Sequence, residues 1–131
     1  MVKLKPIKQY LREYYLIPQD VPCYQETDLI QAIQYLQKFA VSLYSPLVIC
    51  LGVGTNLGDH AGVSVFARYL DLVMVRKSRA AVTCTGNEGN AAHHYHGELT
   101  RQQSSQNVEI RVGGEMGGFV MDFWGGVPYI Y

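Results

Sequence analysis

Apolar residues recur at helical and strand-like spacings along the first two thirds of the chain. Between residues 29 and 43 they return every three or four positions, which predicts an amphipathic helix capped by Thr27. A similar pattern predicts a helix over 63–77, and a shorter Tyr-rich pattern predicts one over 6–15. The continuous apolar runs 47–51 and 80–84 predict strands buried on both faces. Alternation of helices with such strands predicts a partial parallel sheet with flanking helices and a right-handed crossover, an α/β fold.

The pattern changes after residue 97. Residues 98–107 are polar and rich in Gln and Ser, which predicts a connector. Apolar and polar positions then alternate on either side of the glycine-rich segment 113–118, which predicts an antiparallel β-hairpin within residues 108–131. We therefore expect an α/β core over 1–97, a connector, and the start of a β-rich insertion. The last residues, Tyr-Ile-Tyr, carry no cap or polar tail, so we expect an internal segment of a larger protein.

Composition narrows the possible partners. The 131 residues are 48% hydrophobic and 17% charged, with a formal net charge of zero and no long run of either sign. We therefore expect neither nucleic-acid nor membrane binding. The three cysteines, Cys23, Cys50 and Cys84, are widely spaced and are expected to be reduced and buried. The sequence predicts no particular cellular location, because its first residues do not resemble a secretory signal and no other targeting signal is recognised.

The strongest candidate for chemistry is the segment Thr85–Asn90, which follows the second predicted strand. It sets Asn87 in a glycine-flanked turn, where the carboxamide can donate to a developing negative charge. The same residues are also typical of an ordinary turn without a catalytic role, because Asn and Gly both tolerate positive φ.

A glycine-rich loop, Gly52-Val53-Gly54 to Gly58, follows the first predicted strand. Its spacing resembles the loops that hold the pyrophosphate of a nicotinamide dinucleotide at a helix N-terminus. However, several residues separate the loop from the next helix, and no acidic residue ends the following strand. A dinucleotide-binding module is the alternative function, and no cofactor is otherwise expected.

Two further groups of polar residues have simpler explanations. Asp59, His60 and Ser64 lie too close in sequence to converge as a catalytic triad, so loop packing and helix capping are expected. The histidines 93, 94 and 96 are expected to form a loop cluster rather than a metal site.

Together, the two loop motifs resemble the middle of a subtilisin-like serine protease (subtilase). The runs Leu51–Gly62 and Thr85–His94 resemble in particular the clostridial branch that includes the Csp proteases of spore germination. The resemblance covers the chain from about residue 10 onward, and Tyr14–Asp20 and Tyr24–Ile30 add to it. It implies that the hairpin begins a jelly-roll-like insertion.

The resemblance also implies roles for particular residues. Asn87 matches the catalytic asparagine of the oxyanion hole. Gly52, Val53 and Gly54 match the strand edge that pairs with the backbone of a polypeptide substrate. Cys84, Thr85 and Gly86 match the wall of the pocket for the side chain before the scissile bond.

The Asp-Thr-Gly, His-Gly-Thr and Gly-Thr-Ser-Met-Ala segments of subtilases do not occur in the 131 residues. We therefore expect a segment of a serine endopeptidase that is inactive by itself, or a non-catalytic relative with a binding or regulatory role. Because its strands have no expected neighbours, the chain is also expected to self-associate.

Overall fold

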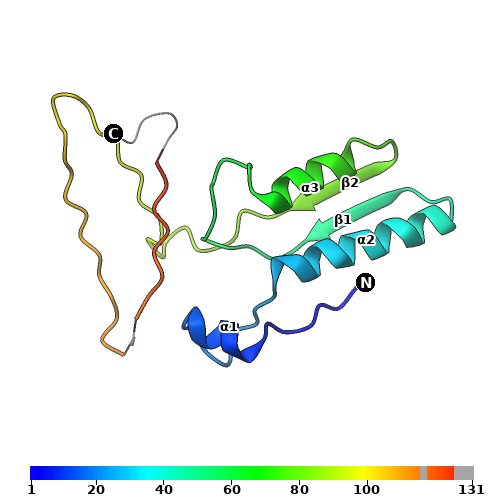
Figure 1. Ribbon diagram of the computed structural model, residues 1–131, viewed down its shortest axis with the longest axis horizontal. Coiled ribbons are helices and arrows are strands. Elements are labelled where there is room, and N and C mark those ends of the chain that lie inside the picture. The colour runs from blue at the N-terminus through cyan, green and yellow to red at the C-terminus, as the bar shows by residue number, and fades with distance from the viewer. Residues whose placement is uncertain (116–117, 126–131) are drawn as a thin grey trace.

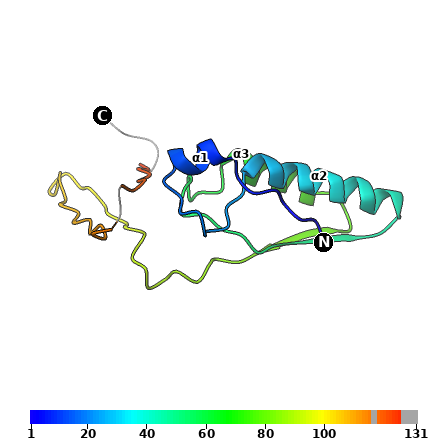
Figure 2. The same cartoon turned by 90° about the horizontal axis from the view of Figure 1, so that it is seen from below.

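The computed structural model describes residues 1–115 and 118–125, and its elements follow the order helix, helix, strand, helix, strand. They are α1 (Gln9–Tyr14), α2 (Glu26–Ser42), β1 (Leu47–Leu51), α3 (Val65–Met74) and β2 (Arg79–Thr83). The strands pair in parallel, with Leu47 opposite Arg79 and Leu51 opposite Thr83. Helices α2 and α3 cover the same face of this sheet (Figures 1 and 2). The predicted α/β class, a parallel sheet with flanking helices, is confirmed.

The core lies between the sheet and its two covering helices. Ile33 of α2, Ile49 of β1 and Val73 of α3 are buried there, and Leu36, Leu47, Leu51, Phe66, Tyr69, Leu70 and Met74 pack against them. The expectation that the three cysteines are buried is wrong, because Cys50 and Cys84 are exposed and Cys23 is half-buried. The expectation that both faces of the strands are buried is also wrong. Val48 and Val82 lie on the other face and are 69% and 55% exposed, because the described residues place no second layer there.

The helices begin where polar groups satisfy their first backbone N–H donors. The expected cap Thr27 is wrong: α2 begins at Glu26, and the carbonyl of Gln25 accepts from the backbone N–H groups of Asp28 and Leu29. For α3 the Ser64 hydroxyl accepts from the Ala67 backbone N–H at 3.1 Å, so the helix begins at Val65 rather than at residue 63. Of the helices that the structure describes, none has both the length and the apolar character needed to cross a bilayer.

The N-terminal segment is held together by a buried guanidinium group. Arg12 on α1 donates through Nη1 to the carbonyl oxygens of Pro18 and Val21. These bonds satisfy the buried charge and fix the proline-flanked stretch that leads to α2. Helix α1 is therefore shorter than the predicted 6–15, and its end is set by this turn.

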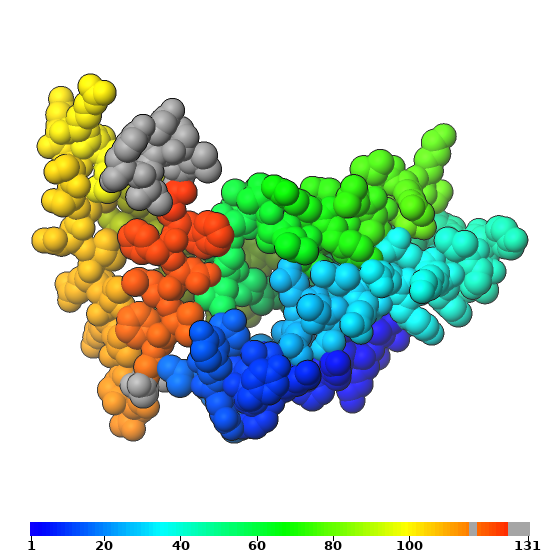
Figure 3. All heavy atoms as spheres, viewed as in Figure 1, coloured from blue at the N-terminus to red at the C-terminus, as the bar shows by residue number. Residues whose placement is uncertain are grey.

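The C-terminal part of the chain differs from the predicted hairpin. Within residues 98–115 and 118–125 there is no strand, and Met116 and Gly117 of the expected turn lie outside the described residues. An isolated two-stranded hairpin is marginal in water, and most of these side chains are exposed. The segment contacts the loop that follows β1, where the Gly58 backbone N–H donates to Asp122 Oδ2 at 2.9 Å. Figure 3 shows the orange and red atoms of the segment beside the green atoms of this loop. The connector and insertion boundaries remain predictions.

We predict that the exposed sheet face and edges drive self-association of the isolated chain. Among the described residues β1 and β2 form a two-stranded sheet, so the outer edge of each strand is unpaired. Sedimentation velocity at several concentrations is expected to show species larger than a monomer, and the double substitution Val48→Lys with Val82→Lys should shift them toward monomer. A monomer at every concentration would contradict the prediction.

Candidate functional site

The parallel pairing of β1 and β2 brings the two predicted loops to the same edge of the sheet. Because Leu51 is paired with Thr83, the segments that follow, Gly52–Gly54 and Cys84–Gly86, leave neighbouring strands at the same level. The Thr83 hydroxyl donates to the Leu51 carbonyl at 3.3 Å and links the strands at this point. Carboxyl ends of parallel strands are the usual position of binding sites in α/β sheets.

The loop after β2 turns sharply before its asparagine. Gly86 has φ of 83°, a left-handed conformation that a residue with a Cβ adopts only with strain. Asn87 follows and is exposed, and its carboxamide makes no hydrogen bond to any other residue that the structure describes. The turn thus presents an unengaged amide N–H₂ group at the end of the sheet.

The loop after β1 leaves room for an approaching backbone. Gly52 and Gly54 are exposed, and a Cβ added to either would meet no atom within 4 Å. Neither φ lies in the left-handed region, so neither the packing nor the conformation of this chain requires glycine there. Glycine at both positions suits the close approach of a ligand from outside.

A polar cluster that the sequence did not indicate joins the two loops. Asn56 donates through Nδ2 to Glu88 Oε2 at 3.1 Å and lies 3.4 Å from His93 Nδ1. The His93 and Glu88 side chains are themselves 3.8 Å apart. Asn56 and Glu88 lie in the two candidate motifs, but their contact spans 32 positions and has no local sequence signal. The cluster thus links the two loops at the protein surface.

Asp59, His60 and Ser64 do not converge, as the sequence predicted. The Asp59 carboxylate accepts from the Val63 backbone N–H, and the Ser64 hydroxyl caps α3. The His60 ring lies 3.1 Å from the Asn56 carbonyl and packs beside His94, with centroids 5.4 Å apart. Local turn and capping bonds therefore occupy these polar groups.

The start of α3 is poorly suited to a pyrophosphate. Two of its first backbone donors are engaged, since the Ser64 hydroxyl accepts from the Ala67 N–H and the Glu26 carboxylate accepts from the Phe66 N–H at 3.1 Å. A carboxylate at this point repels a second anion. Gly58 is also separated from the first residue of α3, Val65, by six loop residues. The geometry therefore disfavours the dinucleotide alternative.

The histidines of the second loop are separated by their contacts. His93 faces Asn56 and Glu88, whereas His94 packs against His60. Within residues 1–115 and 118–125, no three His, Cys, Asp or Glu side chains are grouped so that they can hold a metal ion.

The fold and the position of the loops are consistent with an α/β portion of a subtilisin-like fold. In particular, the chain is similar to the solved structure of the CspB protease of Clostridium perfringens, with a TM-score of 0.54 and 27% sequence identity. The match covers 58% of this chain and 17% of that protein, so the chain spans a small part of its length. No family model and no curated protein matches the chain.

This likeness supports a relationship between the matched part of the chain and a subtilase-like protease. The resemblance inferred from the loop motifs and the structural likeness thus both indicate a relationship to a subtilase-like protease. The likeness does not extend to the roles of individual residues. Those of Asn87, Gly52–Gly54 and Cys84–Gly86 remain proposals.

Proposed function

We propose that this chain supplies the peptide-binding edge and the oxyanion-stabilising asparagine of a subtilisin-like serine endopeptidase. The observation that carries the proposal is the placement of two glycine-containing loops at the carboxyl ends of paired parallel strands. Its likeness to part of a clostridial protease supports the same function.

In the proposed site, an extended polypeptide lies along Gly52–Gly54. Backbone N–H and C=O groups there are exposed, and the lack of side chains at both glycines allows main-chain hydrogen bonds to form. Cys84–Gly86, which leaves the neighbouring strand, forms the wall beside the residue before the scissile bond. The peptide is thereby fixed between the two loops.

Asn87 then acts on the carbonyl oxygen of the bound peptide. When a nucleophile attacks the carbonyl carbon, negative charge develops on that oxygen, and the Asn87 amide donates a hydrogen bond to it. The Gly86 turn sets the direction in which the loop leaves β2, and the bond between Asn56 and Glu88 links this loop to Gly52–Gly54, which favours a donor placed before the reaction begins.

The nucleophile, the base and its orienting carboxylate are not provided by the residues of this site. The subtilase motifs that carry them do not occur in the 131 residues, and Asp59, His60 and Ser64 are engaged elsewhere. The proposed activity therefore requires further polypeptide, and the chain by itself is proposed to bind peptides without cleaving them. A non-catalytic subtilase relative would retain the same binding edge.

Replacing Gly54 by Val is expected to weaken peptide binding about tenfold or more. The added side chain fits the free chain but obstructs the approach of a peptide backbone, and loss of two hydrogen bonds costs about 1–3 kcal/mol. The measurement is the dissociation constant for acetyl-tetraalanine-amide, from chemical-shift changes of the backbone amides. We expect these shifts at residues 52–54 and 84–87.

Gly114→Val is the matched control, because a Cβ there also meets nothing within 4 Å and the residue lies outside the two loops. A second control is the same peptide with N-methylated amides, which cannot donate to the strand edge. The peptide-binding edge would be refuted if the parent chain and Gly54→Val bound the peptide equally. It would also be refuted if the parent chain bound the methylated peptide as tightly as the unmethylated one.

A further inference from the structure

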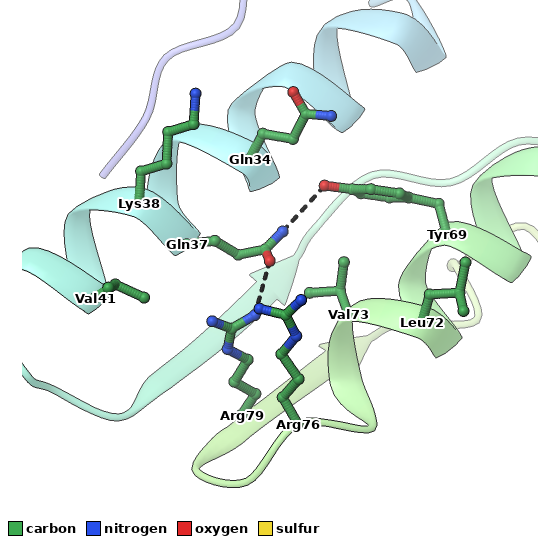
Figure 4. Close-up of a pocket in the computed structure, with 9 residues that line it drawn as sticks. All are labelled: Gln34, Gln37, Lys38, Val41, Tyr69, Leu72, Val73, Arg76 and Arg79. Carbon is green, nitrogen blue, oxygen red and sulfur yellow. Dashed lines mark hydrogen bonds between the residues drawn. The ribbon is translucent and has the colours of Figure 1, made fainter.

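A groove lined by positive charges lies away from the proposed peptide site. It has a volume of about 500 Å³ and runs between α2, α3 and the first residue of β2. Lys38 comes from α2, Arg76 follows α3, and Arg79 begins β2 (Figure 4). Since the two candidate loops leave the strands at their carboxyl ends, the groove and the peptide site occupy opposite ends of β2.

The charge of the groove is not balanced by the residues around it. No Asp or Glu of the described chain lines it. The ion pairs within those residues join Lys5 to Asp28 and His93 to Glu88, and involve none of the three cations. Arg76 and Arg79 line the same groove, together with Lys38. An anion that enters a groove lined by cations without an acidic neighbour is attracted by them.

A neutral side chain holds one of these guanidinium groups in place. Gln37 accepts from Arg79 Nη1 at 2.7 Å through its carbonyl oxygen and donates to the Tyr69 hydroxyl at 3.0 Å through its amide nitrogen. Both bonds are partly buried. A glutamate here would cancel the charge of Arg79, whereas glutamine orients the guanidinium group and leaves its charge available.

We propose that the groove binds a small organic oxyanion, which places its phosphate or carboxylate group against Arg76, Arg79 and Lys38. The planar guanidinium groups can bind such oxygens in pairs, and Lys38 adds a point charge. The walls include Leu72, Val73 and the Tyr69 ring, which can contact a compact apolar body. This site is independent of the proposed peptidase function.

A second hollow extends the site beyond Arg79. It has a volume of about 270 Å³, adjoins the first at Val41 and Arg79, and is lined by Lys77 and Ser78. No acidic residue of the described chain lines this hollow either. Lys77 therefore adds a cation to the hollow that Arg79 shares with the groove, so a ligand with two anionic groups is favoured over a ligand with one.

The test is calorimetric titration of the full 131-residue chain with inorganic phosphate and, separately, with phthalate, an aromatic dicarboxylate. Binding of either probe that weakens as salt is raised is the expected result, because salt screens the charges. Tighter binding of phthalate would identify the ligand class as an organic carboxylate, and tighter binding of phosphate would identify it as a phosphate. Failure of both probes to bind would overturn the proposal.

Gln37→Glu is the variant that tests anion binding in the groove most directly. It keeps the size of the side chain and the bond to Arg79, so the chain is expected to fold, but it places a negative charge in the groove. We expect at least tenfold weaker binding of the better probe, with a thermal midpoint equal to or above that of the parent. Arg76→Gln is expected to weaken binding as well.

Arg68→Gln is the matched control, because Arg68 is exposed on α3 and does not line the groove. It removes one positive charge from α3 and is expected to leave binding within twofold of the parent. Equal affinities for the parent, Gln37→Glu and Arg76→Gln, or equal losses for Arg76→Gln and Arg68→Gln, would show that the probes do not bind in this groove.

Discussion

Replacing Asn87 by Ala is expected to lower the rate of peptide hydrolysis by about two to three orders of magnitude once this segment works with a complete triad. This is the magnitude known for loss of the oxyanion-hole asparagine of subtilisin itself. The physical reason is that, in the proposed role, the amide donates to an oxygen that is negative in the transition state and neutral in the substrate. Its loss therefore lowers kcat more than it raises KM.

The experiment is a chimaera in which the part of this chain that matches the Clostridium perfringens CspB protease replaces its counterpart in that protein, assayed on a chromogenic peptide. Asn90→Ala is the matched control, since Asn90 is exposed in the same loop and has no proposed contact with substrate. It should retain the rate of the chimaera. An Asn87→Ala chimaera as fast as its parent would remove the proposed catalytic role, even if the peptide-binding edge is correct.

Replacing Ile33 by Ala is expected to lower the free energy of unfolding by about 2–5 kcal/mol. Ile33 is 1% exposed and packs in the layer between α2, β1 and α3, with Ile49 and Val73 as its buried neighbours. The substitution removes apolar contacts and leaves a cavity that this thin core can close only in part. Because the core has few buried side chains, the loss is a large share of the stability of a small domain.

Urea denaturation followed by far-ultraviolet circular dichroism measures this change. Val65→Ala is the matched control: it also shortens an aliphatic side chain on a helix, but Val65 is 76% exposed. We expect a change within about 0.5 kcal/mol for the control. Equal losses for the two variants would mean that the core does not lie between α2, α3 and the sheet.

The sequence predicted the helices and strands well where one local signal decided the outcome. Residues 47–51, between Pro46 and Gly52, form β1 as expected, because a short apolar run with such boundaries has few alternatives. The predicted start of α2 was wrong by a few residues. Its first backbone donors are satisfied by the Gln25 carbonyl, while Asp28 pairs with the distant Lys5.

The predicted hairpin shows where local pattern is insufficient. Alternation over 108–112 and 119–124 is compatible with strands, yet the described residues there form none. A hairpin gains stability from a surface that buries one of its faces, and the sequence cannot state whether such a surface is present. The same reason explains why the strands were expected to be buried on both faces, although Val48 and Val82 are exposed.

The sequence by itself determined which residues carry the candidate chemistry: a glycine loop after each strand, with Asn87 in the second. These features depend on residue type and on neighbours in the chain. The tertiary structure alone decided that Asn56 reaches Glu88, that Glu26 occupies the start of α3, and that Gln37 holds Arg79 in a groove. Those contacts join residues 32 to 42 positions apart, and the packing of α2 and α3 on a parallel sheet brings them together.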